Sequence, residues 1–335
     1  MLGQPCFCLV DHRCPHPPHH GKNHPSRSIP KGTFAAVLER QATLSSSLSL
    51  SEKLKEVAAL FKLRLTSLVV FSAVLGYWMG VPAGGFDLTN ALLLALAGLL
   101  VTGASNALNQ VLEVEADGLM KRTAERPLVQ GTVGMVEAMV ISLIVGASGV
   151  LLLWARFGAL TGILGLLSLF MYVVLYTPMK RLTAWSVFVG AFPGAFPPML
   201  GYVAATGQFG LGPGLLFAMQ FMWQFPHYWA IAWVLHDDYR LAGYHMLPSK
   251  GGRDGYTAWL ILLYTLFVIP VGMLPWVFGF CGGWSAVVAA ACGLVMLLPA
   301  MRLFRSRDTK DARKLMFASF IYLPVVLIAY VLDKV

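Results

Sequence analysis

Nine apolar segments, each close to the length needed to cross a bilayer, follow one another through most of the chain. They cover roughly residues 65–82, 88–108, 134–155, 158–176, 184–204, 213–234, 257–280, 284–301 and 316–332. An α-helix needs about 20 mainly apolar residues to cross the hydrocarbon core. No segment shows the alternating ten-residue pattern of barrel strands, so we expect helices. The pattern predicts an all-α, polytopic membrane protein with nine transmembrane helices in a bundle around a central lipid-embedded cavity.

The composition agrees with a membrane protein. Apolar residues make up 57% of the chain and charged residues 12%, against about 45–50% and about 25% in soluble domains. The net charge is +9, and no basic patch interleaved with aromatic residues accompanies it. We therefore interpret the charge as loops facing anionic lipid. The lipid bilayer is the expected partner, and nucleic acid is not.

Lysine and arginine are concentrated in alternate loops. They precede the first apolar segment and follow the second, fourth, sixth and eighth, whereas the intervening loops hold only Arg156 among them. By the positive-inside rule, the N-terminus is cytoplasmic and nine spans place the C-terminus outside. A bacterial plasma (inner) membrane fits this topology. The mitochondrial inner membrane is the alternative, because residues 1–50 are basic and poor in acids, like a transit peptide.

The N-terminal part differs from the rest of the chain. Residues 1–50 carry Pro, His, Ser and basic residues with little periodicity, which predicts a disordered extension. Its Cys and His residues fit no standard zinc spacing. Residues 51–64 are typical of a short amphipathic interfacial helix. We expect the functional domain to span 51–335.

Three polar residues spaced by four close the second apolar segment: Asn109, Glu113 and Asp117. On a helix they lie on one face, one turn apart. Two carboxylates stacked in this way repel each other unless a cation lies between them. Mg²⁺ is commonly bound by one or two carboxylates together with substrate phosphates, and a helix C-terminus also favours a cation. The spacing therefore predicts a Mg²⁺ site.

Two arginines, Arg122 and Arg126, follow this acidic triplet. Guanidinium groups bind phosphate oxygens in a fork. Metal-binding carboxylates and anion-binding arginines in one stretch favour a diphosphate site. The alternative is a solvated loop of mixed charge, but ionisable groups at the end of a membrane span are usually functional.

A second acidic segment, with Asp237, Asp238 and Arg240, follows the sixth apolar segment. It lies four helices after the first, so both are expected on one side of the membrane. By itself, Asp-Asp after a helix is usually a cap or a loop surface. Lys180 and Arg181 follow the fourth segment, and two interpretations stay open for them: plain positive-inside residues or phosphate contacts.

Six motifs, in order, carry a family resemblance. The pattern N-x-x-N-Q-x-x-E-x-x-x-D-x-x-M-x-R-T-x-x-R-P-L, which starts at Asn106, resembles the first signature of the UbiA-type intramembrane prenyltransferase superfamily. The stretches 62–66, 176–183, 190–201, 223–230 and 238–248 resemble its further signatures, and the last three are similar to those of the branch that acts on haem. The resemblance covers about residues 55–335. There are departures: Glu113 stands where the superfamily mostly has Asp, Ala242 breaks a second D-x-x-x-D, and Leu63 replaces a Pro.

The resemblance implies a function: transfer of the farnesyl group of farnesyl diphosphate to a vinyl group of protohaem IX, with addition of water. It implies Mg²⁺ as cofactor and a haem A synthase downstream as a candidate partner. The implied catalytic residues are Asn109, Glu113, Asp117 and Asp238, and these with Asp237 are the implied metal ligands. The implied diphosphate contacts are Lys62, Arg64, Arg122, Arg126, Lys180, Arg181 and Arg240.

His227, with Trp223, is the candidate haem-binding pair; a satisfied polar group in the bundle is the other interpretation of His227. Two rival functions remain. One is a prenyltransferase acting on an aromatic acid or a chlorophyll-like ring. The other is a transporter, for which a charged site at the membrane midplane would be expected, whereas here the charges gather at one face.

Overall fold

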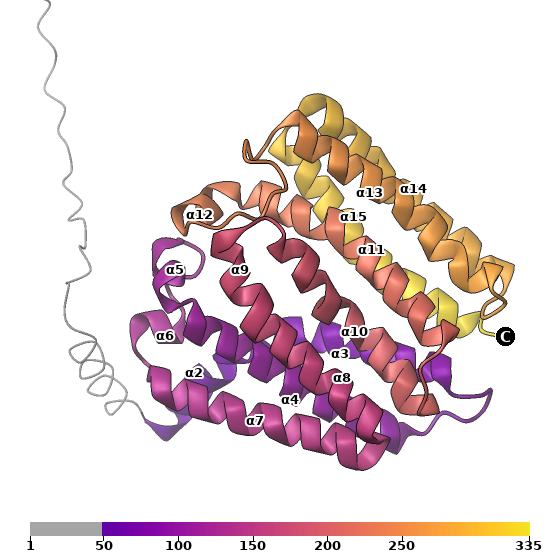
Figure 1. Cartoon of the computed structure of the whole chain (residues 1–335), viewed down its shortest axis with the longest axis horizontal. Helices are drawn as coiled ribbons and strands as arrows, with labels where there is room; N and C mark the ends of the chain where they lie inside the picture. The colour runs from indigo at the N-terminus through magenta and orange to yellow at the C-terminus, as the bar shows by residue number, and fades with distance from the viewer. Residues whose placement is uncertain (1–48) are drawn as a thin grey trace, which may run out of the picture.

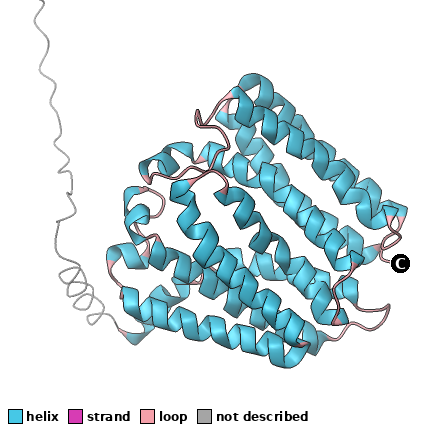
Figure 2. Cartoon of the chain, viewed as in Figure 1, coloured by secondary structure: helices cyan, strands magenta, loops and turns pink. Residues whose placement is uncertain are grey.

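The computed structural model describes residues 49–335, which fold into helices joined by short connections, with no strand among them (Figures 1 and 2). The predictions made for residues 1–48, including the Cys- and His-rich stretch, lie outside the described residues. The long helices are α3 (Leu63–Gly80), α4 (Leu88–Leu112), α7 (Met135–Phe157), α8 (Ala159–Phe170), α10 (Ser186–Thr206), α11 (Leu211–Val234), α13 (Gly255–Val277), α14 (Gly283–Ser306) and α15 (Thr309–Leu332). The short elements are α2 (Leu50–Leu60), α5 (Val114–Leu119), α6 (Pro127–Gln130), the π-helix η1 (Met171–Tyr176), α9 (Thr177–Leu182) and α12 (His236–Leu241). The all-α prediction is confirmed.

Eight helices in the described part of the chain are long and apolar enough to span a membrane, with α8, η1 and α9 forming one of them. The predicted span that is not among these eight is the sixth, 213–234, which corresponds to α11; this helix is 24 residues long and carries no charged side chain, but its mean hydropathy is below that of the eight. It packs between α10, α13 and α15. The count of nine spans therefore stays a prediction.

The polar side chains of α11 donate hydrogen bonds to backbone carbonyls of the neighbouring helix α10, which contains prolines. Pro198 in α10 has no N–H to donate to the carbonyl of Gly194, four residues earlier. The Gln220 side-chain amide donates to that carbonyl at 2.7 Å, and the Gln224 amide donates to the carbonyl of Ala191 at 3.0 Å. Neighbouring helices commonly re-satisfy backbone groups that proline frees within a membrane. The polarity of α11 is thus directed into the bundle.

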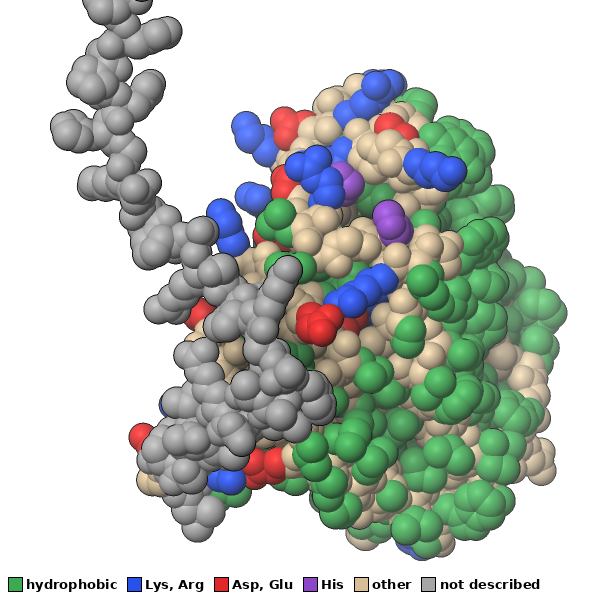
Figure 3. Space-filling view, turned by 60° about the vertical axis from the view of Figure 1, so that its left-hand side comes forward, with side chains coloured by type: hydrophobic (Ala, Val, Ile, Leu, Met, Phe, Trp, Pro, Cys, Tyr) green, Lys and Arg blue, Asp and Glu red, His purple; other side chains and the backbone are tan. Residues whose placement is uncertain are grey.

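The surface of the molecule is that of a protein embedded in lipid. Large apolar side chains are exposed along the spans, while charged side chains gather in one part of the surface (Figure 3). Exposed tryptophans lie near helix ends at both limits of the bundle, as in the aromatic belts of membrane proteins. They are Trp78, Trp154, Trp276 and Trp284 at one limit and Trp185 and Trp259 at the other. The chain is an integral membrane protein.

Helices α3 and α10 are in close backbone contact at two glycines. A Cβ atom on Gly201 would overlap the carbonyl oxygen of Ala73, and a Cβ atom on Gly76 would overlap that of Pro198. Small residues that let backbones approach are the usual means of packing helices in a membrane, where burial of apolar surface gives little driving force.

Replacing Gly201 with alanine is expected to destabilise the fold. The added methyl group must push α3 and α10 apart, and overpacking of this kind costs about 1–3 kcal/mol. Gly214→Ala in α11 is the matched control, because its Cβ would meet open space. Thermal unfolding in detergent should show a midpoint temperature below that of the wild type for Gly201→Ala. The midpoint of Gly214→Ala should not be lowered. Equal midpoints for both variants would contradict the packing argument.

The short elements α5, α6, α9 and α12 gather at one end of the bundle, and the C-terminus lies at the opposite end (Figure 1). Two boundaries at this end differ from those predicted. The interfacial helix ends at Leu60 rather than residue 64, because the chain turns at Lys62 before α3 starts. The fourth span continues to Leu182 rather than residue 176, through the π-helix η1. Both differences bring a lysine to the site.

Candidate active site

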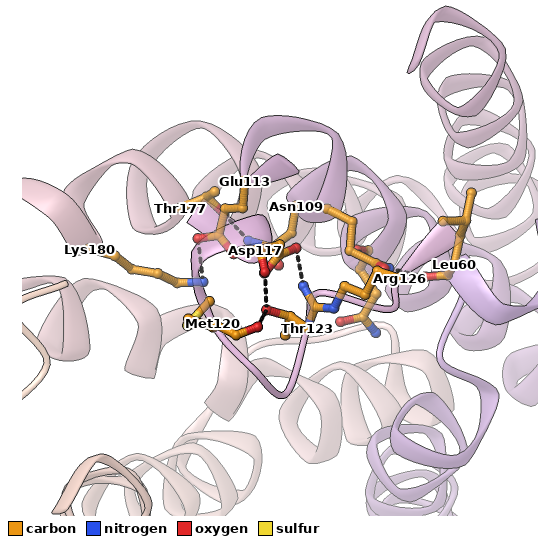
Figure 4. A network of polar contacts seen from close by, with 11 residues as sticks. Leu60, Asn109, Glu113, Asp117, Met120, Thr123, Arg126, Thr177 and Lys180 are labelled. Carbon is orange, nitrogen blue, oxygen red and sulfur yellow. Dashed lines mark hydrogen bonds and ion pairs between the residues drawn. The ribbon is translucent and has the colours of Figure 1, made fainter. Parts of the chain in front are cut away.

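The acidic triplet lies where α4 passes into α5. The helix breaks at Glu113, whose φ is −107° and ψ 10°. Backbone hydrogen bonds nevertheless continue across the break, from Glu113 N to Asn109 O at 3.0 Å and from Asp117 N to Glu113 O at 2.8 Å. The three side chains therefore stay on one face, as their spacing predicts (Figure 4).

These side chains line a cavity of about 160 Å³, which we call the diphosphate cavity after the ligand that the sequence predicts. Its lining also holds four cations from three other parts of the chain. The complete lining is Lys62, Asn109, Glu113, Asp117, Met120, Arg122, Arg126, Tyr172, Tyr176, Lys180, Tyr239, Tyr244 and Met246. The cavity thus combines two carboxylates with four basic side chains, the mixture expected of a site for a metal-bound polyanion.

Two buried ion pairs organise the cavity. Lys180 Nζ lies 2.9 Å from Glu113 Oε1, and Arg126 pairs with Asp117 through Oδ2 (Figure 4). Lys180 Nζ also lies 4.6 Å from the centre of the Tyr176 ring. Breaking a buried pair leaves an uncompensated charge, so each carboxylate and its cation hold one another in place.

The π-helix η1 positions Lys180. Its wider turn precedes Pro178, which has no N–H to continue a regular helix. Thr177 Oγ1 donates to the carbonyl of Tyr172 at 2.8 Å and accepts from Asn109 Nδ2 at 3.0 Å. Single-turn π-helices are frequent at functional sites. Here one links the fourth span to the acidic end of α4.

Lys62 reaches the cavity from a strained turn. Its φ of 46° and ψ of 53° lie in the left-handed region, which is uncommon for a residue other than glycine. Strain of this kind persists where the surroundings impose it, and it clusters at functional sites. Burial lowers the pKa of Lys62 to about 7, and the positive charges of Arg126 and Lys180 add to this effect.

Asp117 is suited to a cation. Its side chain is buried, and burial raises its pKa although Arg126 acts in the opposite direction. Arg126 occupies one carboxylate oxygen, while Oδ1 is buried without a hydrogen-bond partner among residues 49–335. A buried, unpartnered oxygen normally calls for an explanation, and a hard cation that prefers oxygen ligands fits it.

The protein side chains do not form a complete metal site by themselves. Within the described chain, no three His, Cys, Asp or Glu side chains lie close enough to hold a metal ion. Mg²⁺ is commonly held by one or two carboxylates together with substrate phosphates. Glu113, Asp117 and the amide oxygen of Asn109 fit such a shared site.

The second acidic segment does not reach this cavity. Asp237 is exposed and lies 3.2 Å from Arg253. Asp238 is partly buried on α12 but does not line the diphosphate cavity, and Arg240 lines a neighbouring one. The short helix α12 presents Tyr239 to the site instead of its aspartates. Both segments lie at the same end of the bundle, as expected (Figure 1), whereas the assignment of Asp237 and Asp238 as metal ligands stays a prediction.

Two predicted diphosphate contacts also lie outside the cavity. Arg64 is exposed at the start of α3, and Arg181 lies 4.0 Å from the exposed Glu115. Adjacent residues on a helix point about 100° apart, and here Lys180 faces the cavity while Arg181 points away from it.

Four tyrosines in the lining were missed in the sequence: Tyr172, Tyr176, Tyr239 and Tyr244. Tyr172 and Tyr176 stand eight and four residues before Lys180, so helical spacing could have placed them on its face. Nothing comparable marks Tyr244, which follows the end of α12. Aromatic faces attract cations, and these four rings line the same cavity as the carboxylates and basic side chains.

His227 and Trp223 form a packed cluster with α15. Their rings stack with centres 4.3 Å apart, His227 Nδ1 lies 2.8 Å from Ser319 Oγ, and the Trp223 indole donates to the carbonyl of Ser319 at 3.0 Å. Neither residue lines the diphosphate cavity or its larger neighbour. These contacts favour the interpretation of His227 as a hydrogen-bonded polar group within the bundle. Its role as a haem ligand stays a prediction.

Comparison with known proteins places this geometry in context. Residues 69–323 match the UbiA prenyltransferase family. A protein of Cytophaga hutchinsonii named protoheme IX farnesyltransferase is 47% identical over 278 residues, covering 82% of this chain and 96% of that protein. A protein of Christiangramia forsetii with the same name is 46% identical over 293 residues, covering 86% and 95%.

Solved structures share the fold. A structure of digeranylgeranylglyceryl phosphate synthase has a TM-score of 0.71 at 18% identity, covering 84% of this chain and 98% of that one. A UbiA homologue from Archaeoglobus fulgidus bound to GPP and Mg²⁺ has a TM-score of 0.64 at 12% identity, covering 82% and 99%. At such identities the likeness concerns the fold alone.

Proposed function

The chain belongs to the UbiA prenyltransferase family, and from this premise we propose that it transfers the farnesyl group of farnesyl diphosphate to a vinyl group of protohaem IX, giving haem O and diphosphate. The relatives named protoheme IX farnesyltransferase support the choice of donor and acceptor. The observation that carries the proposal is the diphosphate cavity, where two buried carboxylates and four cations meet at one end of a membrane bundle.

The cations stabilise the leaving group. Lys62, Arg122, Arg126 and Lys180 surround the space in which the diphosphate would lie. As the allylic C–O bond breaks, its electron pair leaves with the diphosphate, and negative charge grows on these oxygens. Donors fixed in advance around developing charge are usually the largest contribution to catalysis.

The acceptor supplies the new bond. The π electrons of the haem vinyl group form a C–C bond to C1 of the farnesyl group, which leaves a cation next to the porphyrin ring. Water gives hydroxide to that cation, and its proton passes to the diphosphate. No side chain acts as a nucleophile, so the protein has to hold the substrates and control where water enters. The tyrosines of the lining lie in this cavity, where their rings can stabilise a cation.

Mg²⁺ is the proposed cofactor, and when bound it neutralises the diphosphate charge. Asp117 Oδ1, Glu113 and the amide oxygen of Asn109 would hold it, together with phosphate oxygens. Glu113 and Asp117 currently pair with Lys180 and Arg126. Each carboxylate would therefore use its oxygens both for Mg²⁺ and for its basic partner, Lys180 or Arg126.

Product analysis tests the proposal. The purified protein, given protohaem IX, farnesyl diphosphate and MgCl₂, should yield a haem heavier by one farnesyl group plus one water in mass spectrometry. A chelator should remove the activity, and added Mg²⁺ should restore it. Absence of that product would refute the proposal, and prenylation of an aromatic acid instead would establish the rival prenyltransferase function.

Lys62 should make substrate capture pH-dependent. With a pKa of about 7 in the empty protein, Lys62 is protonated below pH 7 and neutral above it. The profile of kcat/KM reports groups of the free enzyme, so kcat/KM for farnesyl diphosphate should fall by about tenfold as pH rises through 7, the effect of one contact to a charged group. Lys62→Arg keeps its charge at all these pH values and should not show the fall. The same fall in Lys62→Arg would assign it to another group.

We place the protein in a bacterial plasma membrane, with the site end in the cytoplasm and the C-terminus outside; the mitochondrial inner membrane is the second candidate. The C-terminus lies at the end opposite the site (Figure 1), and the relatives named above are bacterial. A C-terminal alkaline phosphatase fusion, active only outside the cytoplasm, should be active.

A haem A synthase is a candidate partner for the product, and its copurification from membranes would test that.

A further inference from the structure

A second, larger cavity adjoins the diphosphate cavity at the same end of the bundle. It has a volume of about 780 Å³ and lies between the α9–α10 connection (182–185), α12 and the following loop (243–252). The two cavities share Tyr239, Tyr244 and Met246 in their walls. A molecule in the larger cavity would therefore reach the diphosphate cavity across these three side chains.

The basic side chains of this cavity are of two kinds, and Thr183, Ser249 and two tyrosines are its other polar side chains. Two are imidazoles, His236 and His245, and two are cations, Arg240 and Lys250. A farnesyl chain would use none of them, because it is a hydrocarbon without charge or metal. Imidazole is a common ligand of haem iron, and arginine and lysine pair with carboxylates. The chemistry therefore indicates an anionic ligand that carries a metal.

The remaining lining suits a broad apolar body. Leu182 and Trp185 are 76% and 67% exposed at the rim, and Leu247 is buried within. Ligand pockets of about 300–1,000 Å³ are mainly apolar with a few placed polar groups. A porphyrin has this form: its faces are apolar, its two propionates lie on one edge, and its two vinyl groups lie on the other side of the ring.

The backbone fixes this cavity relative to the reaction centre. The loop approaches the His236 ring at Gly252, where a Cβ atom would come within 2.8 Å of Nε2. The backbone N–H of His245 donates to the carbonyl of Lys180 at 2.9 Å. Lys180 itself pairs with Glu113 in the diphosphate cavity. The loop that carries one imidazole is thus hydrogen-bonded to the residue that contacts the leaving group.

We propose that this larger cavity binds protohaem IX, with the propionates at Arg240 and Lys250, the imidazoles of His236 and His245 at the iron, and a vinyl group towards Tyr239, Tyr244 and Met246. This assignment rests on the proposed function and gives the acceptor a place that His227 does not offer. It also reassigns Arg240 from the diphosphate to the acceptor. The shared wall is then where the new C–C bond forms.

Haem titration of the purified full chain in detergent tests the assignment without requiring turnover. The double variant His236→Ala/His245→Ala should bind haem at least about tenfold more weakly and shift the Soret band. His227→Ala, the rival assignment, should leave band and affinity unchanged. An unchanged Soret band and affinity in the double variant, or their loss in His227→Ala alone, would overturn the proposal.

A charge variant provides a second measurement at exposed positions, where folding is least affected. Arg240→Gln/Lys250→Gln should raise KM for haem about tenfold or more and leave KM for farnesyl diphosphate unchanged. Arg302→Gln/Arg305→Gln is the matched control, because it removes two exposed charges that line neither cavity. Equal KM values for haem in both double variants would refute the propionate contacts.

The two proposals fail in different ways. A wild-type protein that binds haem through His236 and His245 but forms no farnesylated haem would refute the proposed function and keep the haem cavity. A wild-type protein that forms the product, while the double histidine variant binds haem normally, would refute the cavity and keep the function.

Discussion

Asp117→Asn should lower kcat by about a thousandfold, the upper range for losing one group that stabilises transition-state charge. Asparagine keeps the size of the side chain but removes the negative charge that pairs with Arg126 and faces the cation through Oδ1. The variant also leaves Arg126 without its buried partner, so the unfolding temperature should fall as well. Product formation by mass spectrometry and thermal unfolding in detergent measure the two effects separately.

The matched control is Glu115→Gln on the same short helix. Glu115 has a side chain that is 91% exposed, and its contact with Arg181 is 4.0 Å long. Loss of this acid should leave kcat unchanged, because it faces away from the cavity. A fall in both variants would indicate a general effect of charge at α5, and wild-type turnover in Asp117→Asn would contradict the assignment of this carboxylate to the reaction.

Helical spacing and position in the chain sufficed to predict the centre of the site. Asn109, Glu113 and Asp117 share a face and line the cavity, as their spacing and their place at the end of an apolar segment predict. Lys62, Arg122, Arg126 and Lys180 all line the cavity as expected. The acidic triplet was placed correctly because its arrangement is local geometry, which the period of a helix determines, whereas the four basic residues were implied by the family resemblance.

Orientation of short elements could not be predicted in the same way. The aspartates of α12 were expected in the cavity by analogy with α5, yet α12 directs Tyr239 there and leaves Asp237 at the surface. A six-residue helix can rotate by one residue at little cost in local energy, so its packing against the loop 243–252 decides which face it presents. Long-range packing of this kind has no signal in the spacing of a single sequence.

Polar residues in a span were equally ambiguous. The amides of α11 lower its hydropathy below that of the other spans, although they bond to α10 carbonyls inside the bundle. His227 likewise gave two interpretations, and the choice between them depends on Ser319, 92 residues away. Only the tertiary structure shows which partner satisfies such a group.

The buried pair Glu113–Lys180 allows structural and catalytic roles to be separated. Both side chains are buried, and their 2.9 Å contact joins two spans. Glu113→Gln leaves Lys180 as an unpaired buried cation, and Lys180→Met leaves the carboxylate unpaired. Removing one partner of such a pair typically costs about 3–5 kcal/mol, so each single variant should unfold at a clearly lower temperature and lack turnover.

The double variant Glu113→Gln/Lys180→Met should recover most of the lost stability, because no unpaired charge stays buried. Neutral replacements of buried ion pairs are often tolerated. Turnover should not recover, because the cavity then lacks both a metal ligand and a diphosphate contact. The control cycle, Glu115→Gln with Arg181→Gln, concerns an exposed pair at 4.0 Å and should change stability by about 0–1 kcal/mol. Turnover regained together with stability would mean that the pair only supports the fold. Stability regained without turnover would show that the same two charges that hold α4 and α9 together also act on the substrate.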